Sequence, residues 1–117
     1  MGKVSEHFSR KEFACQCGCG LDSIDSMTIE ALEAIRVHFG KPITINSANR
    51  CVTHNAAVGG ASKSQHLRSR ACDIVVKDVE HDLVADYAES LGISVGRYNS
   101  FTHVDTRSGL AARWDNR

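Results

Sequence analysis

The sequence has no excess of charge of either sign and no long hydrophobic run. Lysine and arginine total 14 residues, and aspartate and glutamate total 14, so the two signs cancel. The strong basic field of a nucleic-acid binder is therefore absent. No stretch approaches the roughly 20 apolar residues of a transmembrane helix, and residues 1–9 lack the apolar segment of a secretory signal. We expect a chain made in the cytoplasm, with neither nucleic acid nor membrane as a partner.

Linker signals are also scarce. Pro42 is the only proline, and the sequence contains no internal repeat, low-complexity tract or block of like charges. A chain of this length buries roughly two thirds of the surface that its unfolded form exposes, which allows one modest core. We expect a single domain over residues 1–117 that is monomeric.

Cysteine, by contrast, is frequent, with five residues in 117. An odd number cannot all pair internally, and without an export signal free thiols or a metal site are favoured over a disulfide framework. Cys15, Cys17 and Cys19 are separated by single residues, whereas structural zinc sites usually space paired ligands by two to four. The favoured interpretation is a glycine-rich loop that carries thiols, and a metal on this trio is the lesser alternative.

The periodicity of apolar residues predicts the positions of two helices and four strands along the chain. Residues 27–39 form a helix that Ser26 caps and Gly40 ends, and residues 79–91 form a second helix. The other expected elements are strands at 43–45 and 71–76, a long loop at 47–64, and a hairpin of 93–98 with 101–105. This order predicts an α+β domain with a small, mainly antiparallel sheet and helices packed on one side.

Asp73 is the most unusual residue, because it places a carboxylate in an otherwise apolar strand, where an unpaired charge is costly. His66 precedes that strand, and His103 lies in an apolar frame in the last strand. Two imidazoles and a carboxylate are the ligand set of a catalytic zinc, which keeps a fourth position for water. A buried hydrogen bond between Asp73 and one histidine, without metal, explains the spacing equally well.

Three motifs carry a resemblance to a known family. The stretch from Ser64 to Asp73, SQHLRSRACD, resembles the Ser-x-His-x-x-Gly-x-Ala-x-Asp signature of the zinc D-alanyl-D-alanine carboxypeptidase family, the LAS-type peptidoglycan peptidases. Upstream, SANRC at 47–51, His54-Asn55 and VGG at 58–60 resemble the family's small, phage-type endolysin branch. Downstream, HVDTR at 103–107 resembles its last ligand motif, and the similarity covers nearly the whole chain.

The resemblance implies a Hedgehog/D,D-peptidase-like fold with one zinc ion on the face of the sheet, held by His66, Asp73 and His103. It also implies that Arg50, expected in an exposed loop, polarises the scissile carbonyl or holds substrate. Ser64 is expected to bind substrate or to act only as a turn residue. The substrate would be the stem peptide of peptidoglycan. The bond that is cut, D-Ala-D-Ala, L-Ala-D-Glu or a cross-link, stays open.

The sequence departs from the family pattern at two important places. Ser69 stands where the signature has a glycine, in a turn that prefers positive φ. Many relatives carry an acidic general base three residues before the last histidine, and here that position is Ser100. Asp105 lies two residues after His103 and should share its face of the strand. It is predicted as the general base, or alternatively as the group that orients a ligand histidine.

Two other functions compete with the zinc peptidase. Cys51 and His54 are close enough in sequence for a cysteine nucleophile and its base. The absence of an acid at Ser100 favours a non-catalytic, zinc-containing module that binds the cell wall or has a structural role. The expected setting is lysis by a phage or prophage endolysin that reaches the wall through a membrane pore.

Overall fold

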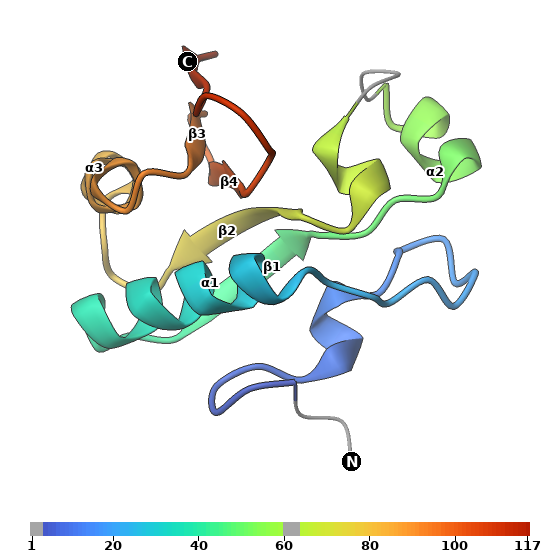
Figure 1. Cartoon of the computed structure of the whole chain (residues 1–117), viewed down its shortest axis with the longest axis horizontal. Coiled ribbons are helices and arrows are strands. Elements are labelled where there is room, and N and C mark those ends of the chain that lie inside the picture. The colour runs from blue at the N-terminus through green and yellow to red at the C-terminus, as the bar shows by residue number, and fades with distance from the viewer. Residues whose placement is uncertain (1–3, 60–63) are drawn as a thin grey trace.

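The computed structural model describes residues 4–59 and 64–117. Its elements, with η for 3-10 helices, are η1 Arg10–Phe13, α1 Ser26–Phe39, β1 Ile43–Ser47, α2 Val52–Ala57, η2 Gln65–Arg68, β2 Ala71–Val76, α3 His81–Ser90, β3 Ser94–Arg97, β4 Thr102–Asp105 and β5 Arg113–Asp115 (Figure 1). None of the helices described is both long and apolar enough to cross a membrane.

The five strands form one sheet in the order β1-β2-β4-β3-β5. Every neighbouring pair is antiparallel except β3 with β5, which is parallel. The predicted α+β class and the predicted hairpin, now β3 with β4, are confirmed. Strand β5 was not predicted, because three residues are too few to show the period of two that marks a strand.

Helices α1 and α3 pack on one face of the sheet, as expected. Alternation along β2 and β4 turns apolar side chains toward these helices and turns Asp73 and His103 to the opposite face. The buried core joins the sheet and both helices through Leu32, Ile35, Cys72, Ile74, Val76, Val84, Ala85, Ala88, Val95 and Val104. The polar face of β2 and β4 is thereby left to the candidate site.

Helix α1 begins one residue earlier than predicted and has a different cap. The Asp25 carboxylate accepts a hydrogen bond from the backbone N–H of Met27 at 2.8 Å, and Ser26 is the first residue of the helix. Asp25 is as good a capping residue as Ser26, so the cap was misplaced by one position. At the other end Gly40 has a φ of 62°, which confirms the predicted stop.

The predicted loop at 47–64 is partly wrong. Ser47 belongs to β1, and Val52–Ala57 form α2. The glycine and serine residues around this segment favoured a loop prediction. They outweighed the short stretch Asn55 to Ala57, in which alanine favours a helix. Residues 60–63, including Gly60 of the VGG motif, lie outside the described residues.

Candidate metal centre

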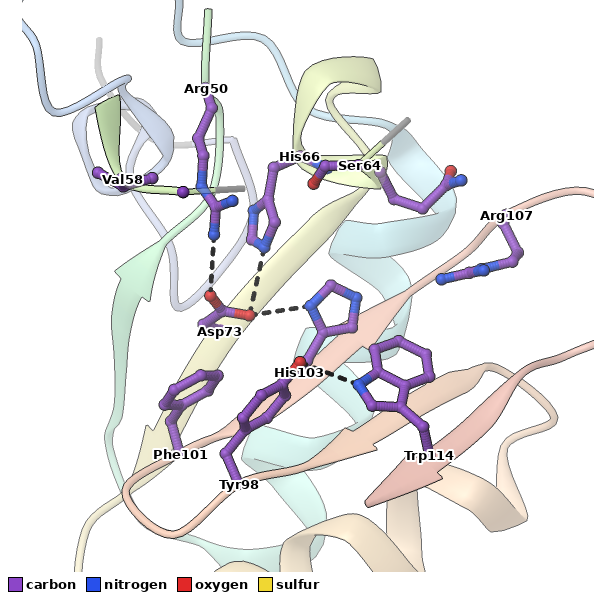
Figure 2. Close-up of a pocket in the computed structure, with 12 residues that line it drawn as sticks. Arg50, Val58, Ser64, His66, Asp73, Tyr98, Phe101, His103, Arg107 and Trp114 are labelled. Carbon is purple, nitrogen blue, oxygen red and sulfur yellow. Dashed lines mark hydrogen bonds and ion pairs between the residues drawn. The ribbon is translucent and has the colours of Figure 1, made fainter. Parts of the chain in front are cut away.

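The three predicted ligands lie together on the polar face of the sheet (Figure 2). One ligand atom from each of His66, Asp73 and His103 lies within 4.8 Å of the others. The antiparallel register of β2 with β4 puts Asp73 directly opposite His103, and η2, just before β2, supplies His66. All three are buried, with exposed fractions of 2%, 7% and 7% for His66, Asp73 and His103. We call this group the His-Asp-His site.

Each imidazole has an oxygen acceptor at both of its nitrogens. His66 Nδ1 lies 2.6 Å from the Ala48 carbonyl and its Nε2 lies 3.3 Å from Asp73 Oδ1. His103 Nε2 lies 2.7 Å from Asp105 Oδ2 and its Nδ1 lies 2.9 Å from Asp73 Oδ1. Without a cation, both rings need a proton on each nitrogen to make these contacts. A divalent cation replaces the two inner protons and leaves the outer N–H groups in place, so the donor set fits a metal.

The charges around the site also favour a cation. Burial raises the pKa of Asp73, but hydrogen bonds from His103 and His66 outweigh it and lower the pKa to about 2. Burial lowers the pKa of His103, but hydrogen bonds to Asp105 and Asp73 outweigh it, and the net pKa is raised. Asp73 therefore stays ionised, and together with Asp105 it stabilises positive charge on the imidazole of His103, which lies between the two carboxylates.

Asp105 lies behind His103, on the side away from Asp73. Its side chain is fully buried, and its Oδ1 and Oδ2 accept from Arg107 Nε at 2.8 Å and Nη2 at 2.6 Å. Burial raises the pKa of Asp105, but the hydrogen bonds from Arg107 and His103 hold it well below its usual range. The contact with His103 is direct, and Asp105 is not among the described residues that line the pocket at the site.

Arg50 is not exposed, contrary to expectation. Its side chain is 14% exposed, because three neighbours hold the guanidinium against the sheet. Nη2 lies 3.4 Å from Asp73 Oδ2, Nη1 donates to Asn55 Oδ1 at 3.1 Å, and Nε donates to Ser47 Oγ at 3.3 Å. The fixed positive charge therefore lies at the edge of the His-Asp-His site.

Two serines shape the segment that carries His66. Ser64 caps η2, since its Oγ accepts from the backbone N–H of His66 at 3.2 Å, and it also lines the pocket. Ser69 ends η2 with a φ of 58°, the left-handed conformation expected where the family signature has glycine. Its Oγ donates to Asn49 Oδ1 at 2.6 Å, a tertiary hydrogen bond that helps to hold this conformation.

A pocket of about 720 Å³ opens over the site. Its aromatic wall was not identified from the sequence: Tyr98 stacks on Phe101 with ring centroids 4.4 Å apart, and Trp114 Nε1 donates to the Tyr98 hydroxyl at 2.9 Å (Figure 2). Arg107 also lines the pocket. Phenylalanine, tyrosine and tryptophan make up only 6% of the chain, so three of them within its last 20 residues were the available signal.

The pocket contains few carboxylates. Among the described residues that line it, Asp73 is the only acid. Ser100 is exposed in the turn between β3 and β4 and is not among the lining residues. Asp82 and Asp115 lie 2.6 and 2.8 Å from the guanidinium of Arg117, and the described lining residues include neither of them nor Glu80.

The cysteine-peptidase interpretation finds no support at this pocket. The thiol of Cys51 lies 3.6 Å from that of Cys17, and Cys51 is not among the described lining residues. The side chain of His54 lies outside the described part of the structure. Cys72 is fully buried in the core, because it alternates with Asp73 along β2 and faces away from the pocket.

Comparison with known proteins places the chain in a family. The model of the family described as Peptidase M15 matches residues 6–105, a range that contains all three candidate ligands. The chain belongs to the peptidase M15 family. The zinc D-Ala-D-Ala carboxypeptidase of Streptomyces albus G is 36% identical to the M15 chain over 85 residues. That alignment covers 67% of this chain and 33% of the relative, so the M15 chain matches about a third of the relative's length.

Proposed function

We propose that this M15 chain is a zinc peptidase that hydrolyses peptide bonds of bacterial peptidoglycan. His66 Nε2, Asp73 and His103 Nδ1 would hold the metal. The observation that carries the proposal is the arrangement of oxygens around the two imidazoles, each of which has one nitrogen beside an outer acceptor and the other beside Asp73. The name of the Streptomyces relative supports both zinc and the D-Ala-D-Ala bond.

The position of each residue at the pocket indicates its role in the proposed reaction. A bound zinc polarises a carbonyl and lowers the pKa of its water toward about 7. Arg50, whose guanidinium lies 3.4 Å from Asp73, holds the carbonyl oxygen and stabilises the negative charge that develops on it. Its three hydrogen bonds keep the guanidinium in place before substrate arrives, which lowers the cost of reorganisation during the reaction.

The pocket suits a short, anionic peptide. Its volume of about 720 Å³ is in the usual range for sites that hold small ligands. Arg50 and Arg107 supply positive charge, and Tyr98, Phe101 and Trp114 form an apolar wall. Stem peptides of peptidoglycan combine carboxylates with the small methyl side chain of alanine, which matches this lining. Ser64, at the same pocket, would bind the peptide backbone.

Asp105 acts in this proposal as a positioning residue for His103. Its carboxylate accepts from Nε2 of His103, which leaves Nδ1 without a proton and aimed at the metal. Its side chain is fully buried, accepts three hydrogen bonds from Arg107 and is not among the described residues that line the pocket, so the geometry favours this role over that of the general base.

The direct test is product analysis with zinc-loaded protein. Purified peptidoglycan and a synthetic stem pentapeptide are incubated with the wild type, with Asp73→Asn and with Asp86→Asn, an exposed carboxylate on α3 that serves as the matched control. We expect the wild type and Asp86→Asn to release free alanine or shorter peptides, identified by mass spectrometry, and Asp73→Asn to release none. Intact substrate after incubation with fully metal-loaded wild type contradicts the proposal.

One observation favours a second candidate, a zinc-containing module that binds the cell wall without cutting it. Asp73, a candidate ligand, is the only acid among the described lining residues, so the pocket shows no separate general base. This candidate predicts that the metal-loaded protein sediments with purified peptidoglycan and leaves it chemically unchanged.

We also propose that the enzyme acts in lysis, as the resemblance to the small phage-type endolysins implies. In that case the substrate is the peptidoglycan of the intact cell wall, which the enzyme reaches from the cytoplasm through a membrane pore. Lysis of cells that co-express the chain and a pore-forming phage protein, but not of cells that express either alone, is the expected result. Equal survival in all three cultures contradicts a lytic role.

A further inference from the structure

A second group of potential ligands lies outside the pocket. Cys15, Cys17 and Cys19 come from the loop between η1 and α1, and Cys51 directly precedes α2. Their sulfur atoms all lie within 4.8 Å of one another. In Figure 1 the loop after η1 lies beside the segment that leads into α2, although the two are 34 positions apart at Cys17 and Cys51. We call these four residues the thiol cluster.

The sulfur spacings match a metal site better than a disulfide. Cys15 Sγ lies 3.5 Å from Cys17 Sγ, and Cys17 Sγ lies 3.6 Å from Cys51 Sγ. A disulfide requires about 2.05 Å between the sulfurs. Four thiolates at about 2.3 Å from a tetrahedral zinc lie about 3.8 Å from one another. These two distances are thus within a few tenths of an ångström of those in a zinc tetrahedron, and the remaining sulfur pairs lie within 4.8 Å.

The backbone of the loop is shaped to bring alternate cysteines together. The N–H of Cys15 donates to the carbonyl of Leu21 at 2.7 Å and closes the loop. Gly18, between Cys17 and Cys19, and Gly20, directly after Cys19, have φ values of 82° and 90°, a conformation that side chains disfavour, and they let the chain turn at these closely spaced cysteines. These glycines explain how a spacing of one residue, unusual for zinc, presents several thiols to one point.

The second segment arrives with its own contacts. The backbone N–H of Cys51 points at Cys15 Sγ, 3.4 Å away, and N–H donors of this kind stabilise the negative charge of a metal-bound thiolate. Asn49 ties the same segment to the carbonyl of Phe13 through its Nδ2 at 2.7 Å. The Asn49 bond involves no thiol, so it holds the two segments side by side independently of the cluster.

We propose that Cys15, Cys17, Cys19 and Cys51 bind a structural zinc ion, in addition to the metal of the His-Asp-His site. Thiolates are soft ligands that select zinc over magnesium or calcium, and four of them leave no open position for substrate. The ion ties the N-terminal loop to the segment from Ala48 to Cys51. That segment supplies the carbonyl that orients His66 and the guanidinium of Arg50, so the ion supports the geometry of the pocket from behind.

The test is a metal count with variants that separate the two sites. The wild type, purified without chelator, is expected to contain two zinc ions per chain by elemental analysis. Asp73→Ala and the double variant Cys17→Ser, Cys19→Ser should each contain one. Cys72→Ala, which removes the one cysteine outside the thiol cluster, is the matched control and should keep two. A double variant that contains as much zinc as the wild type overturns the proposal, whatever the occupancy of the His-Asp-His site.

Two measurements on proteins with an intact thiol cluster cover the case in which the double variant fails to fold. Cobalt loaded into Asp73→Ala should show the intense near-ultraviolet absorption of thiolate-to-cobalt charge transfer, which nitrogen and oxygen ligands do not give. A mercurial reagent should release one zinc per chain from the wild type. A disulfide within the cluster, iron in place of zinc, or the absence of thiolate absorption refutes the site. These results do not depend on peptidase activity, so failure of the proposed function leaves them unchanged.

Discussion

Asp105→Asn tests the link between the fold and the metal most directly. In the wild type both carboxylate oxygens accept from Arg107, and Oδ2 also accepts from His103 Nε2 at 2.7 Å. An asparagine must place its NH₂ group at one of these two positions. At Oδ2 it would face His103 Nε2 and drive the ring proton to Nδ1, the nitrogen that faces the metal. At Oδ1 it would face the Nε–H and the backbone N–H of Arg107, and the guanidinium must then turn toward water.

The expected loss of zinc affinity in Asp105→Asn depends on which of these two orientations the asparagine adopts. Arg107 is 28% exposed and can rehydrate, so the second orientation is favoured and His103 keeps a weaker, neutral acceptor. Loss of such an orienting partner typically weakens metal binding by about 10- to 100-fold, which is about 1.4–2.8 kcal/mol. The folding cost should be smaller than the ~3–5 kcal/mol of breaking a fully buried ion pair, because Arg107 regains water.

The assay is competition for zinc with a chromophoric chelator, in a Cys17→Ser, Cys19→Ser background so that the thiol cluster does not contribute. The Asp86→Asn control changes an exposed carboxylate that accepts from Arg97 at 2.7 Å and should leave zinc affinity unchanged. Turnover of the Asp105→Asn variant should recover when zinc is saturating. Unchanged zinc affinity together with lost turnover would refute the positioning role and return Asp105 to the role of general base.

Three further predictions concern the pocket. Arg50→Ala should keep its zinc and lose turnover by roughly 100-fold or more, with Arg50→Lys between it and the wild type; near-normal turnover in Arg50→Ala contradicts a role in the reaction. Gly96→Ala should displace Trp114, whose ring a Cβ at this position would overlap, and raise KM more than it changes zinc content, as measured by kinetics and elemental analysis; an unchanged KM contradicts the aromatic wall. In the metal-free fold the pKa of His103 is raised above its unfolded value of about 6.5. Protonated His103 therefore stabilises this fold fully at a pH below about 6.5, and this contribution is lost as the pH rises through the folded pKa. In a variant without the thiol cluster, the increase in Tm on adding zinc should therefore grow from about pH 5 to about pH 8, and a constant increase contradicts the assignment of His103.

Local pattern was enough to predict most of the fold. Strand β2 is an apolar run, and helix α1 has an apolar stripe that ends at Gly40. Both patterns depend only on residues close in sequence, so periodicity predicts both elements directly. Helix α2 and strand β5 are short, and each depends on packing more than on its own period. The cap of α1 moved by one residue because Asp25 and Ser26 are both good caps, and only the backbone path chooses between them.

The sequence by itself determined the chemistry of the candidate site and its family resemblance. A carboxylate in an apolar strand requires a partner, and the order of His66, Asp73 and His103 within their motifs indicated which residues would supply it. Only the tertiary structure brought Cys51 to the cysteines of the N-terminal loop, buried Arg50 beside Asp73, and turned Asp105 toward the outer nitrogen of His103. These contacts either join residues on separate elements or involve one particular nitrogen of the His103 ring. They are decided by strand register and packing, which local periodicity does not encode.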